Sequence, residues 1–224
     1  MKADRDAIAV PDLSRPWAIV PLRGLETAKT RLGGELDAEE RLELVVAMAV
    51  QTLEATRGSS RLAGTLLVTA DPAAARLAER FGARTLVQRI AGLNAAIREA
   101  RAIAVGELAT AIAVLPIDLA AVSAATIDDL LGSADRAPAG RPLVLVVPDR
   151  HGAGTNILVV APPTAIDPAF GTDSREAHRA AAAAAGATYL EAGGPLTLDV
   201  DTADDLLAAE AGAHASSAGQ DHPG

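Results

Sequence analysis

Short apolar runs alternate with amphipathic stretches along most of the chain. Apolar runs bounded by turn residues predict buried strands; they cover residues 17–22, 65–69, 84–87, 111–115, 142–147, 156–160 and 196–200. Apolar positions at helical spacing predict helices; these cover residues 38–57, 72–81, 93–105, 124–131 (capped by Ser123) and 174–185, with a last helix opening at Thr202. This alternation predicts an α/β fold in which a mostly parallel sheet carries helices on both faces.

The same pattern divides the chain into one domain and two ends. Residues 1–15 show no periodicity, and we expect a loose leader there. Residues 212–224 are small and polar, and we expect a disordered tail. Residues 16–211 contain neither an internal repeat nor a linker, which predicts a single domain of ordinary size.

Composition excludes several classes of protein. Half of the 224 residues are apolar and 22% are charged, so the chain can build a sizeable core. The absence of cysteine excludes disulfides, thiolate metal sites and a cysteine nucleophile. The sequence shows neither an apolar run long enough to cross a membrane nor a signal-peptide pattern, and we expect a cytoplasmic protein.

The chain as a whole is acidic, but one short segment is locally basic. The net charge of −9 and the aromatic content of 2% argue against a nucleic-acid partner, which needs a basic footprint. After the first predicted strand, however, Arg23, Lys29 and Arg31 face a single acid, Glu26. This segment is interpreted either as a phosphate cradle or as an ordinary solvated loop, because its spacing is not that of a Walker P-loop.

Three aspartates accompany predicted buried strands. Asp118 lies just past residues 111–115, where an unpaired carboxylate would be costly; a metal ligand, a turn before a helix and a salt bridge all explain it. Strand periodicity places Asp199 and Asp201 on one face, where two carboxylates repel each other unless a cation lies between them. Mg²⁺ prefers such oxygen ligands. Asp201 alternatively helps to begin the next helix.

Two segments supply small residues, hydroxyls and exposed backbone amides, namely 152–156 and 170–174. Ser174 begins a predicted helix, where a serine either helps to bind an anion or only caps the helix. His178 follows one turn later on the same face. No two of the four histidines have metal-ligand spacing, which argues against a zinc site.

Taken in order, these segments resemble the guanylyltransferases of coenzyme F420 biosynthesis, which couple GTP to 2-phospho-L-lactate or phosphoenolpyruvate. The matching segments are Ala28-Lys-Thr-Arg-Leu32, Gly92-Leu-Asn94, Leu115-Pro-Ile-Asp-Leu119, Pro148-Asp-Arg-His-Gly-Ala-Gly-Thr-Asn156, Phe170-Gly-Thr-Asp-Ser174 with His178, and Leu198-Asp-Val-Asp-Thr202. The family often has alanine and a second proline where this chain has Ile117 and Ala120. The segment before Gly92 is also short, which leaves base recognition open.

The resemblance implies a GT-A-like, Rossmann-related nucleotidyltransferase fold with Mg²⁺ as the cofactor. It implies that Asp118 and Asp199 hold the metal, and strand periodicity adds Asp201. The residues implied to contact the phosphorylated three-carbon acid are Thr155, Gly171, Ser174 and His178. Those implied to contact the nucleotide are Lys29 and Asn94, together with Arg23 of the basic segment. Catalysis is assigned to Lys29, Arg31, Asp118 and Asp199.

The expected reaction is in-line attack of the substrate's phosphate oxygen on the α-phosphorus of GTP, with pyrophosphate leaving. Such a transfer needs positioning and charge neutralisation rather than a general base. Two alternatives are a related nucleotidyltransferase that makes a nucleotide-sugar or a molybdopterin dinucleotide, and a non-catalytic nucleotide-binding module that regulates a partner. The sequence does not decide whether the acid is phosphoenolpyruvate, 2-phospholactate or 3-phosphoglycerate. It does not decide the oligomeric state either.

Overall fold

Strands and helices alternate as the periodicity predicts. The computed structural model describes residues 11–25 and 36–200. Its strands are β1 (Pro16–Pro21), β2 (Gly64–Thr69), β3 (Arg84–Val87), β4 (Ala111–Val114), β5 (Leu143–Pro148), β6 (Thr155–Ala161) and β7 (Thr188–Glu191). Its helices are α1 (Ala38–Gly58), α2 (Pro72–Arg80), α3 (Leu93–Gly106), α4 (Ala124–Ser133) and α5 (Ser174–Ala184), with short 3-10 helices η2 (Ala134–Arg136) and η3 (Pro195–Thr197).

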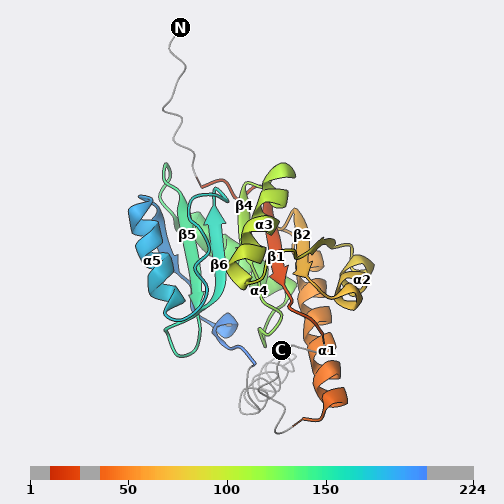
Figure 1. The fold of residues 1–224 in the computed structure, drawn as a ribbon. Coiled ribbons are helices and arrows are strands. Elements are labelled where there is room, and N and C mark those ends of the chain that lie inside the picture. Colours follow the sequence, from red (N-terminus) through yellow and green to blue (C-terminus); the bar gives the residue numbers. More distant parts are fainter. Residues whose placement is uncertain (1–10, 26–35, 201–224) are drawn as a thin grey trace, which may run out of the picture.

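The seven strands form one sheet in the order β3-β2-β1-β4-β6-β5-β7 (Figure 1). Strands β1 to β4 pair in parallel, as do β5 and β7, whereas β6 runs antiparallel to both of its neighbours. The predicted mostly parallel sheet is therefore confirmed, with β6 as its reversed strand. The chain runs from β1 out to β3 and then returns across β1 to β4. Open α/β sheets bind ligands at such a reversal, outside the carboxyl ends of the strands.

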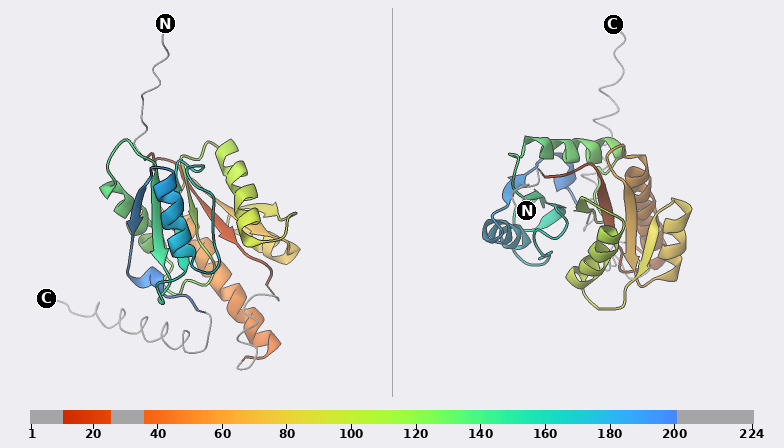
Figure 2. Two further views of the ribbon diagram at one scale, coloured as in Figure 1. Left: turned by 60° about the vertical axis from the view of Figure 1, so that its left-hand side comes forward. Right: turned by 90° about the horizontal axis from the view of Figure 1, so that it is seen from above.

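Helices cover both faces of the sheet (Figure 2). Helices α1, α2 and α4 bury apolar side chains against one face, and α3 and α5 do so against the other. The alternation along β1 shows this division, because Ala18 and Val20 pack with the first group and Trp17 and Ile19 pack with α3. Burial on both faces explains why the strands are continuous apolar runs rather than alternating ones.

Side chains at the helix N-termini determine where the helices begin. Asp37, Asp71 and Ser123 each accept a hydrogen bond from a backbone amide of the turn that follows. Such caps satisfy amide groups that have no partner within the helix itself. The predicted starts of α1, α2 and α4 are confirmed because they depend on residues only a few positions away.

Two predictions in the last part of the described chain were wrong. The periodicity predicts no strand at Thr188–Glu191, which contains polar residues and lacks a continuous apolar run, yet β7 pairs with β5 and is the outermost strand on that side of the sheet. Residues 196–200 are predicted as a strand, but 196 and 197 belong to η3 and the three residues after it contribute one isolated bridge pair. The amides of Thr197 and Leu198 bond back to carbonyls at the start of this turn, so they are not available to a neighbouring strand. The helix predicted to open at Thr202 lies outside the described residues.

Residues just before β1 already contact the rest of the domain. The amide of Arg15 donates to Oγ1 of Thr110 at 3.0 Å, the amide of Thr110 donates back to the carbonyl of Arg15, and Leu13 packs against the core. The predicted domain boundaries at 15 and 211 stay predictions, since residues 1–10 and 201–224 lie outside the described part. Within that part, no helix is both long enough and apolar enough to cross a membrane.

Candidate functional site

The predicted site residues that the structure describes gather at one edge of the sheet. The carboxyl ends of β1, β4, β5 and β7 form this edge together with the start of β6, because β6 is reversed. Arg23 follows β1, Asp118 follows β4 and Thr155 begins β6. Helix α5 begins beside them, since the amide of Arg175 donates to the carbonyl of Ala153 in the β5–β6 turn at 3.2 Å.

Asp118 and Asp199 are brought to neighbouring positions by backbone pairing. The amide of Val200 donates to the carbonyl of Asp118 at 2.8 Å, and the next residue pair along, Leu119 and Asp199, forms an isolated antiparallel bridge. Both aspartates are half-buried. The backbones of Asp118 and Asp199, which are distant in sequence, therefore lie next to each other.

Two side chains from other elements hold these segments. Gln51 of α1 donates through Nε2 to the carbonyls of Ala120 and Val122, at 3.3 and 3.1 Å. Asn156 of β6 is only 6% exposed and donates through Nδ2 to the carbonyl of Leu196 at 3.2 Å. Neither residue has a role predicted from the sequence, although Asn156 ends one of the matching motifs.

The aspartate pair fits a hard divalent cation. Carboxylate oxygens are the ligands that Mg²⁺ prefers, and it commonly takes one or two from the protein and the rest from water and substrate phosphates. Among the described residues, no group of three or more His, Cys, Asp or Glu side chains could hold a metal, so a cation on this pair would need further ligands from substrate, from water or from residues outside the described part. Asp201, Lys29 and Arg31 lie outside the described residues.

A cavity of about 690 Å³ opens at the reversal of strand order. Its walls come from the carboxyl ends of β1 to β4 and from the first turn of α3. They include Arg23, Gln88, Arg89, Gly92, Leu93 and Pro116. Apolar walls with two arginines suit a base linked to anionic phosphates. The structure thus places Arg23, a predicted nucleotide contact, in a cavity large enough for part of a nucleotide.

Asp71 ties the segment after β1 to the start of α2. Its Oδ2 accepts a hydrogen bond from the amide of Leu25 at 2.9 Å, while its Oδ1 accepts one from the amide of Ala73 at 2.8 Å. The hydrogen bond from Leu25 contributes most to lowering the pKa of Asp71 below its ordinary value. The sequence alone does not indicate this contact, because Asp71 and Leu25 are 46 positions apart.

Asn94 bonds to backbone groups of another segment. Its Oδ1 accepts from the amide of Phe170 at 2.8 Å, and its Nδ2 donates to the carbonyl of Phe170 at 2.9 Å. These paired hydrogen bonds clamp the start of α3 to the segment that precedes α5. The predicted nucleotide contact of Asn94 stays a prediction, and the structure shows the side chain engaged in this clamp.

The four residues predicted to hold the phosphorylated acid lie together where β6 begins beside α5. Thr155 Oγ1 is 3.0 Å from Nδ1 of His178. The amide of Ser174 donates to the carbonyl of Gly171 at 3.2 Å, which closes a turn. Gly171 has φ +138°, a backbone conformation that favours glycine. This grouping supports a common role, although the contacts with a ligand stay predictions.

His178 is completely buried. Its ring meets Phe170 edge to face with centroids 5.2 Å apart, and its Nε2 accepts from the amide of Ala169 at 3.0 Å. Burial lowers the pKa of His178 to about 4, so the ring is neutral near pH 7. Both ring nitrogens form hydrogen bonds within the protein, so His178 can affect a bound ligand only indirectly, through Thr155 and the segment at Ala169.

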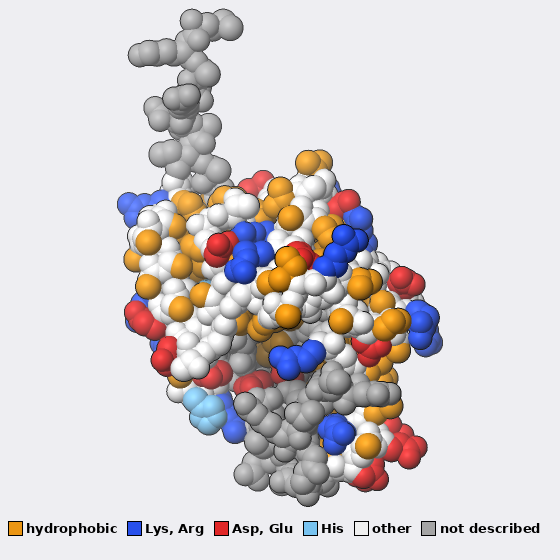
Figure 3. Space-filling model, in the orientation of Figure 1, with side chains coloured by type: hydrophobic (Ala, Val, Ile, Leu, Met, Phe, Trp, Pro, Cys, Tyr) orange, Lys and Arg blue, Asp and Glu red, His pale blue; other side chains and the backbone are white. Residues whose placement is uncertain are grey.

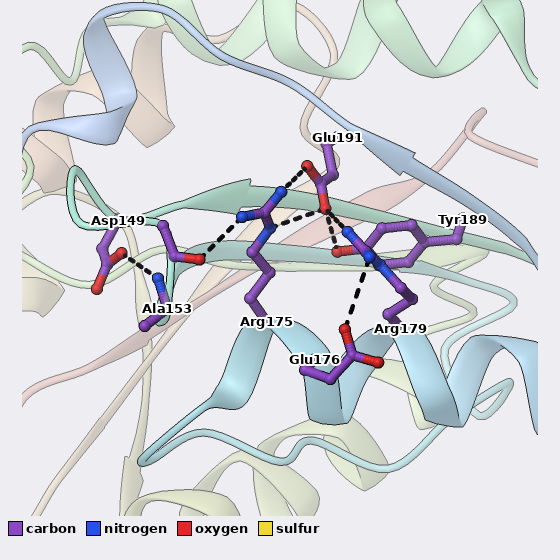
Figure 4. Close-up of polar contacts among 8 residues, drawn as sticks. Asp149, Ala153, Arg175, Glu176, Arg179, Tyr189 and Glu191 are labelled. Carbon is purple, nitrogen blue, oxygen red and sulfur yellow. Dashed lines mark hydrogen bonds and ion pairs between the residues drawn. The ribbon is translucent and has the colours of Figure 1, made fainter.

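Arg175 links this region to β7 (Figure 4). Its Nε and Nη2 donate to the two carboxylate oxygens of Glu191 at 2.9 and 2.8 Å, and its Nη1 donates to the carbonyl of Gly152 at 2.8 Å. Arg179 and Tyr189 also donate to Glu191. These hydrogen bonds, above all that from Arg175, lower the pKa of Glu191 to about 2. No local sequence pattern predicts this network, because its partners come from three separate elements.

Basic and acidic side chains are interspersed on the face of the molecule drawn in Figure 3. The described residues visible there form no continuous basic surface of the kind that nucleic-acid binding requires. The expectation of no nucleic-acid partner stays a prediction from the charge of the whole chain.

Sequence comparisons identify close relatives. The family model described as "Guanylyl transferase CofC like" matches residues 17–216. A phosphoenolpyruvate guanylyltransferase of Conexibacter woesei is 41% identical over 195 residues, which cover 85% of each chain. One of Sphaerobacter thermophilus is 36% identical over 203 residues, which cover 89% of this chain and 96% of the relative.

Solved structures share the fold. A putative nucleotide-diphospho-sugar transferase of Desulfovibrio desulfuricans has a TM-score of 0.65 at 16% identity and covers 85% of this chain and 84% of its own. A nucleotidyl transferase of Methanothermobacter has a TM-score of 0.58 at 17% identity, with coverage of 86% and 94%. A Mycobacterium tuberculosis protein in complex with manganese has a TM-score of 0.51 at 19% identity, with coverage of 88% and 98%. The predicted nucleotidyltransferase fold is therefore confirmed.

Proposed function

The chain belongs to the CofC-like guanylyl transferase family, and we propose that it joins GTP to phosphoenolpyruvate with release of pyrophosphate. The observation that carries the choice of substrate is the 41% identity, over 85% of each chain, with a relative named phosphoenolpyruvate guanylyltransferase. The geometry supports it, because the aspartate pair, the cavity beside β1 and the Thr155–Ser174 region share one edge of the sheet.

In the proposed reaction, a phosphate oxygen of phosphoenolpyruvate attacks the α-phosphorus of GTP. A new P–O bond forms there while the bond from that phosphorus to the oxygen bridging to the β-phosphate breaks, and pyrophosphate leaves with the electron pair. The product, enolpyruvoyl-2-diphospho-5′-guanosine, would serve coenzyme F420 biosynthesis; 2-phospho-L-lactate would give lactyl-2-diphospho-5′-guanosine. The attacking phosphate is already an anion near neutral pH, because its second pKa is about 6, so no general base is needed.

The chain's own residues supply binding and orientation. Thr155, Ser174 and the backbone at Gly171 would hold the acid, and Arg23 would contact the nucleotide phosphates in the cavity. Holding both reactants in line supplies much of the rate of a phosphoryl transfer. Lys29 and Arg31, outside the described residues, are proposed to balance the charge that develops on the leaving pyrophosphate.

Mg²⁺ is the proposed cofactor. Asp118 and Asp199 would hold it, and Asp201 is a third candidate ligand outside the described residues. A divalent cation bound there supplies positive charge that neutralises triphosphate oxygens. Two half-buried aspartates in segments joined by backbone hydrogen bonds support this choice. A cytoplasmic location stays a prediction from the sequence.

Pyrophosphate release tests this function directly. The full chain would be incubated with Mg²⁺, with GTP, ATP, CTP or UTP, and with phosphoenolpyruvate, 2-phospho-L-lactate, 3-phosphoglycerate or a sugar 1-phosphate. We expect release with GTP and phosphoenolpyruvate. Turnover of only a sugar 1-phosphate would instead indicate a nucleotide-sugar enzyme. GTP binding without pyrophosphate release under any condition would indicate a regulatory module and contradict the proposal.

A further inference from the structure

The buried ring of His178 has a defined proton arrangement. A backbone amide can only donate, so Nε2 of His178, which the amide of Ala169 approaches at 3.0 Å, must present its lone pair. Burial lowers the pKa of the ring to about 4, so it is neutral near pH 7 and carries a single proton. That proton is therefore on Nδ1, which faces Thr155 Oγ1 at 3.0 Å.

This arrangement limits what the hydroxyl group of Thr155 can do. Because Nδ1 carries the proton, it donates to Oγ1 and cannot accept from it. A hydroxyl has one proton to donate, and the proton of Thr155 must therefore point toward a different partner. Thr155 is half-exposed at the edge of the sheet where the acid is proposed to bind, so a ligand can take this hydrogen bond.

We propose that His178 is a positioning residue, which makes the Thr155 hydroxyl a hydrogen-bond donor and so selects an acceptor-only group, a carboxylate or phosphate oxygen, at this place. The identity of that ligand as phosphoenolpyruvate rests on the proposed function. Hydrogen bonds to charged acceptors are stronger than those between neutral groups. Losing the orientation of Thr155 therefore weakens binding of the acid and leaves GTP binding unchanged.

Two substitutions separate this role from ordinary packing. Asparagine places its side-chain nitrogen near the position of Nδ1, so His178→Asn keeps a donor to Thr155 and loses the acceptor for Ala169. Glutamine places its side-chain oxygen near the position of Nε2, so His178→Gln keeps the acceptor and loses the donor. If His178 served packing alone, His178→Asn would not bind the acid better than His178→Gln.

Kinetics on these variants test the proposal. We expect His178→Gln to raise the KM for phosphoenolpyruvate about tenfold, the effect of one lost hydrogen bond, with the KM for GTP unchanged. His178→Asn should stay within about threefold of the wild type by the same reasoning, because it keeps that bond. In a Thr155→Val background, His178→Gln should cause no further increase. Equal effects of the two His178 variants, or parallel changes in both KM values, would overturn the proposal.

A spectroscopic measurement on the wild-type chain depends neither on the folding of variants nor on the reaction. The ¹⁵N spectrum distinguishes a protonated imidazole nitrogen from an unprotonated one. At pH 7 we expect Nδ1 of His178 to be protonated and Nε2 to be unprotonated, and an unprotonated Nδ1 would overturn the proposal. Absence of pyrophosphate release from GTP and phosphoenolpyruvate would contradict the proposed function, while this spectrum would still decide the proton arrangement.

Discussion

Asp199 pairs with Leu119 in an isolated antiparallel bridge, which sets the carboxylate of Asp199 beside the segment that carries Asp118. The bridge is reinforced by the hydrogen bond between the amide of Val200 and the carbonyl of Asp118. Backbone pairing of this kind does not depend on the carboxylates. The bridge itself therefore persists when either carboxylate is replaced by an amide, which makes the pair open to a direct test.

Neutralising either aspartate should remove most of the activity. We expect Asp118→Asn and Asp199→Asn each to lower kcat/KM by about 100-fold or more, because several kcal/mol of charge stabilisation would be lost. The melting temperature should hardly change. Asp129→Asn, at an exposed position of α4, is the matched control and should leave both quantities unaltered. Near-full activity of Asp199→Asn at saturating Mg²⁺ would contradict the assignment.

Removal of divalent ions should have the same effect as removal of the carboxylates. We expect EDTA to abolish pyrophosphate release and excess Mg²⁺ to restore it. Ligands that bind the folded state raise the melting temperature, so Mg²⁺ with GTP should stabilise the wild type more than Asp199→Asn. Full activity in metal-free buffer, or equal stabilisation of the two proteins, would argue against a metal on this pair.

Arg175 should affect binding of the acid through the β5–β6 turn. Arg175→Met removes the hydrogen bond to the carbonyl of Gly152, and we expect the KM for phosphoenolpyruvate to rise about tenfold while the KM for GTP stays constant. Arg179→Met is the control, because Arg179 donates to the same Glu191 carboxylate, whereas the hydrogen bond to the carbonyl of Gly152 comes from Arg175. An equal rise in both variants would show that the ion pair, not the turn, matters.

Gly154 should resist substitution because of a close approach in the same turn. A Cβ atom added there would lie 2.5 Å from Oδ2 of Asp149, whose Oδ1 accepts the amide of Ala153 at 3.0 Å. We expect Gly154→Ala to lower the free energy of unfolding by about 1–3 kcal/mol in chemical denaturation. Gly106→Ala, at the end of α3 with nothing within 4 Å of the added atom, should leave stability equal or slightly higher. An equal loss of unfolding free energy in Gly154→Ala and Gly106→Ala would contradict this account.

Asp128 should make stability depend on pH in the acid range. Burial opposes its charged form, but hydrogen bonds from Ser59 and Ser60 outweigh burial and lower its pKa from 3.8 to about 2. A carboxyl group whose pKa is lower in the folded state than in the unfolded state stabilises the fold at pH values above its unfolded pKa. This contribution is lost as the pH falls to the pKa of the folded state. The melting temperature of Asp128→Asn should therefore lie below that of the wild type at pH 7. The difference should shrink between pH 4 and 2, and a constant difference would refute this.

The candidate site could be predicted only in part. The sequence indicates Asp118 because a carboxylate after an apolar strand is unusual, and Ser174 because it begins a helix. Asp71, Asn156 and Arg175 gave no comparable signal, because each acts by bonding to a backbone group or side chain of a distant segment. Residue type and spacing cannot show such partners.

By itself, the sequence determined the order of strands and helices as far as α5, the helix starts near residues 38 and 72 and after Ser123, and the family to which the chain belongs. These features depend on local periodicity, local capping and ordered motifs. Only the tertiary structure decided the reversed direction of β6, the edge strand β7, the pairing of Asp199 with Leu119 and the complete burial of His178. Each of these depends on the register and packing between segments far apart in the chain, which no local pattern encodes.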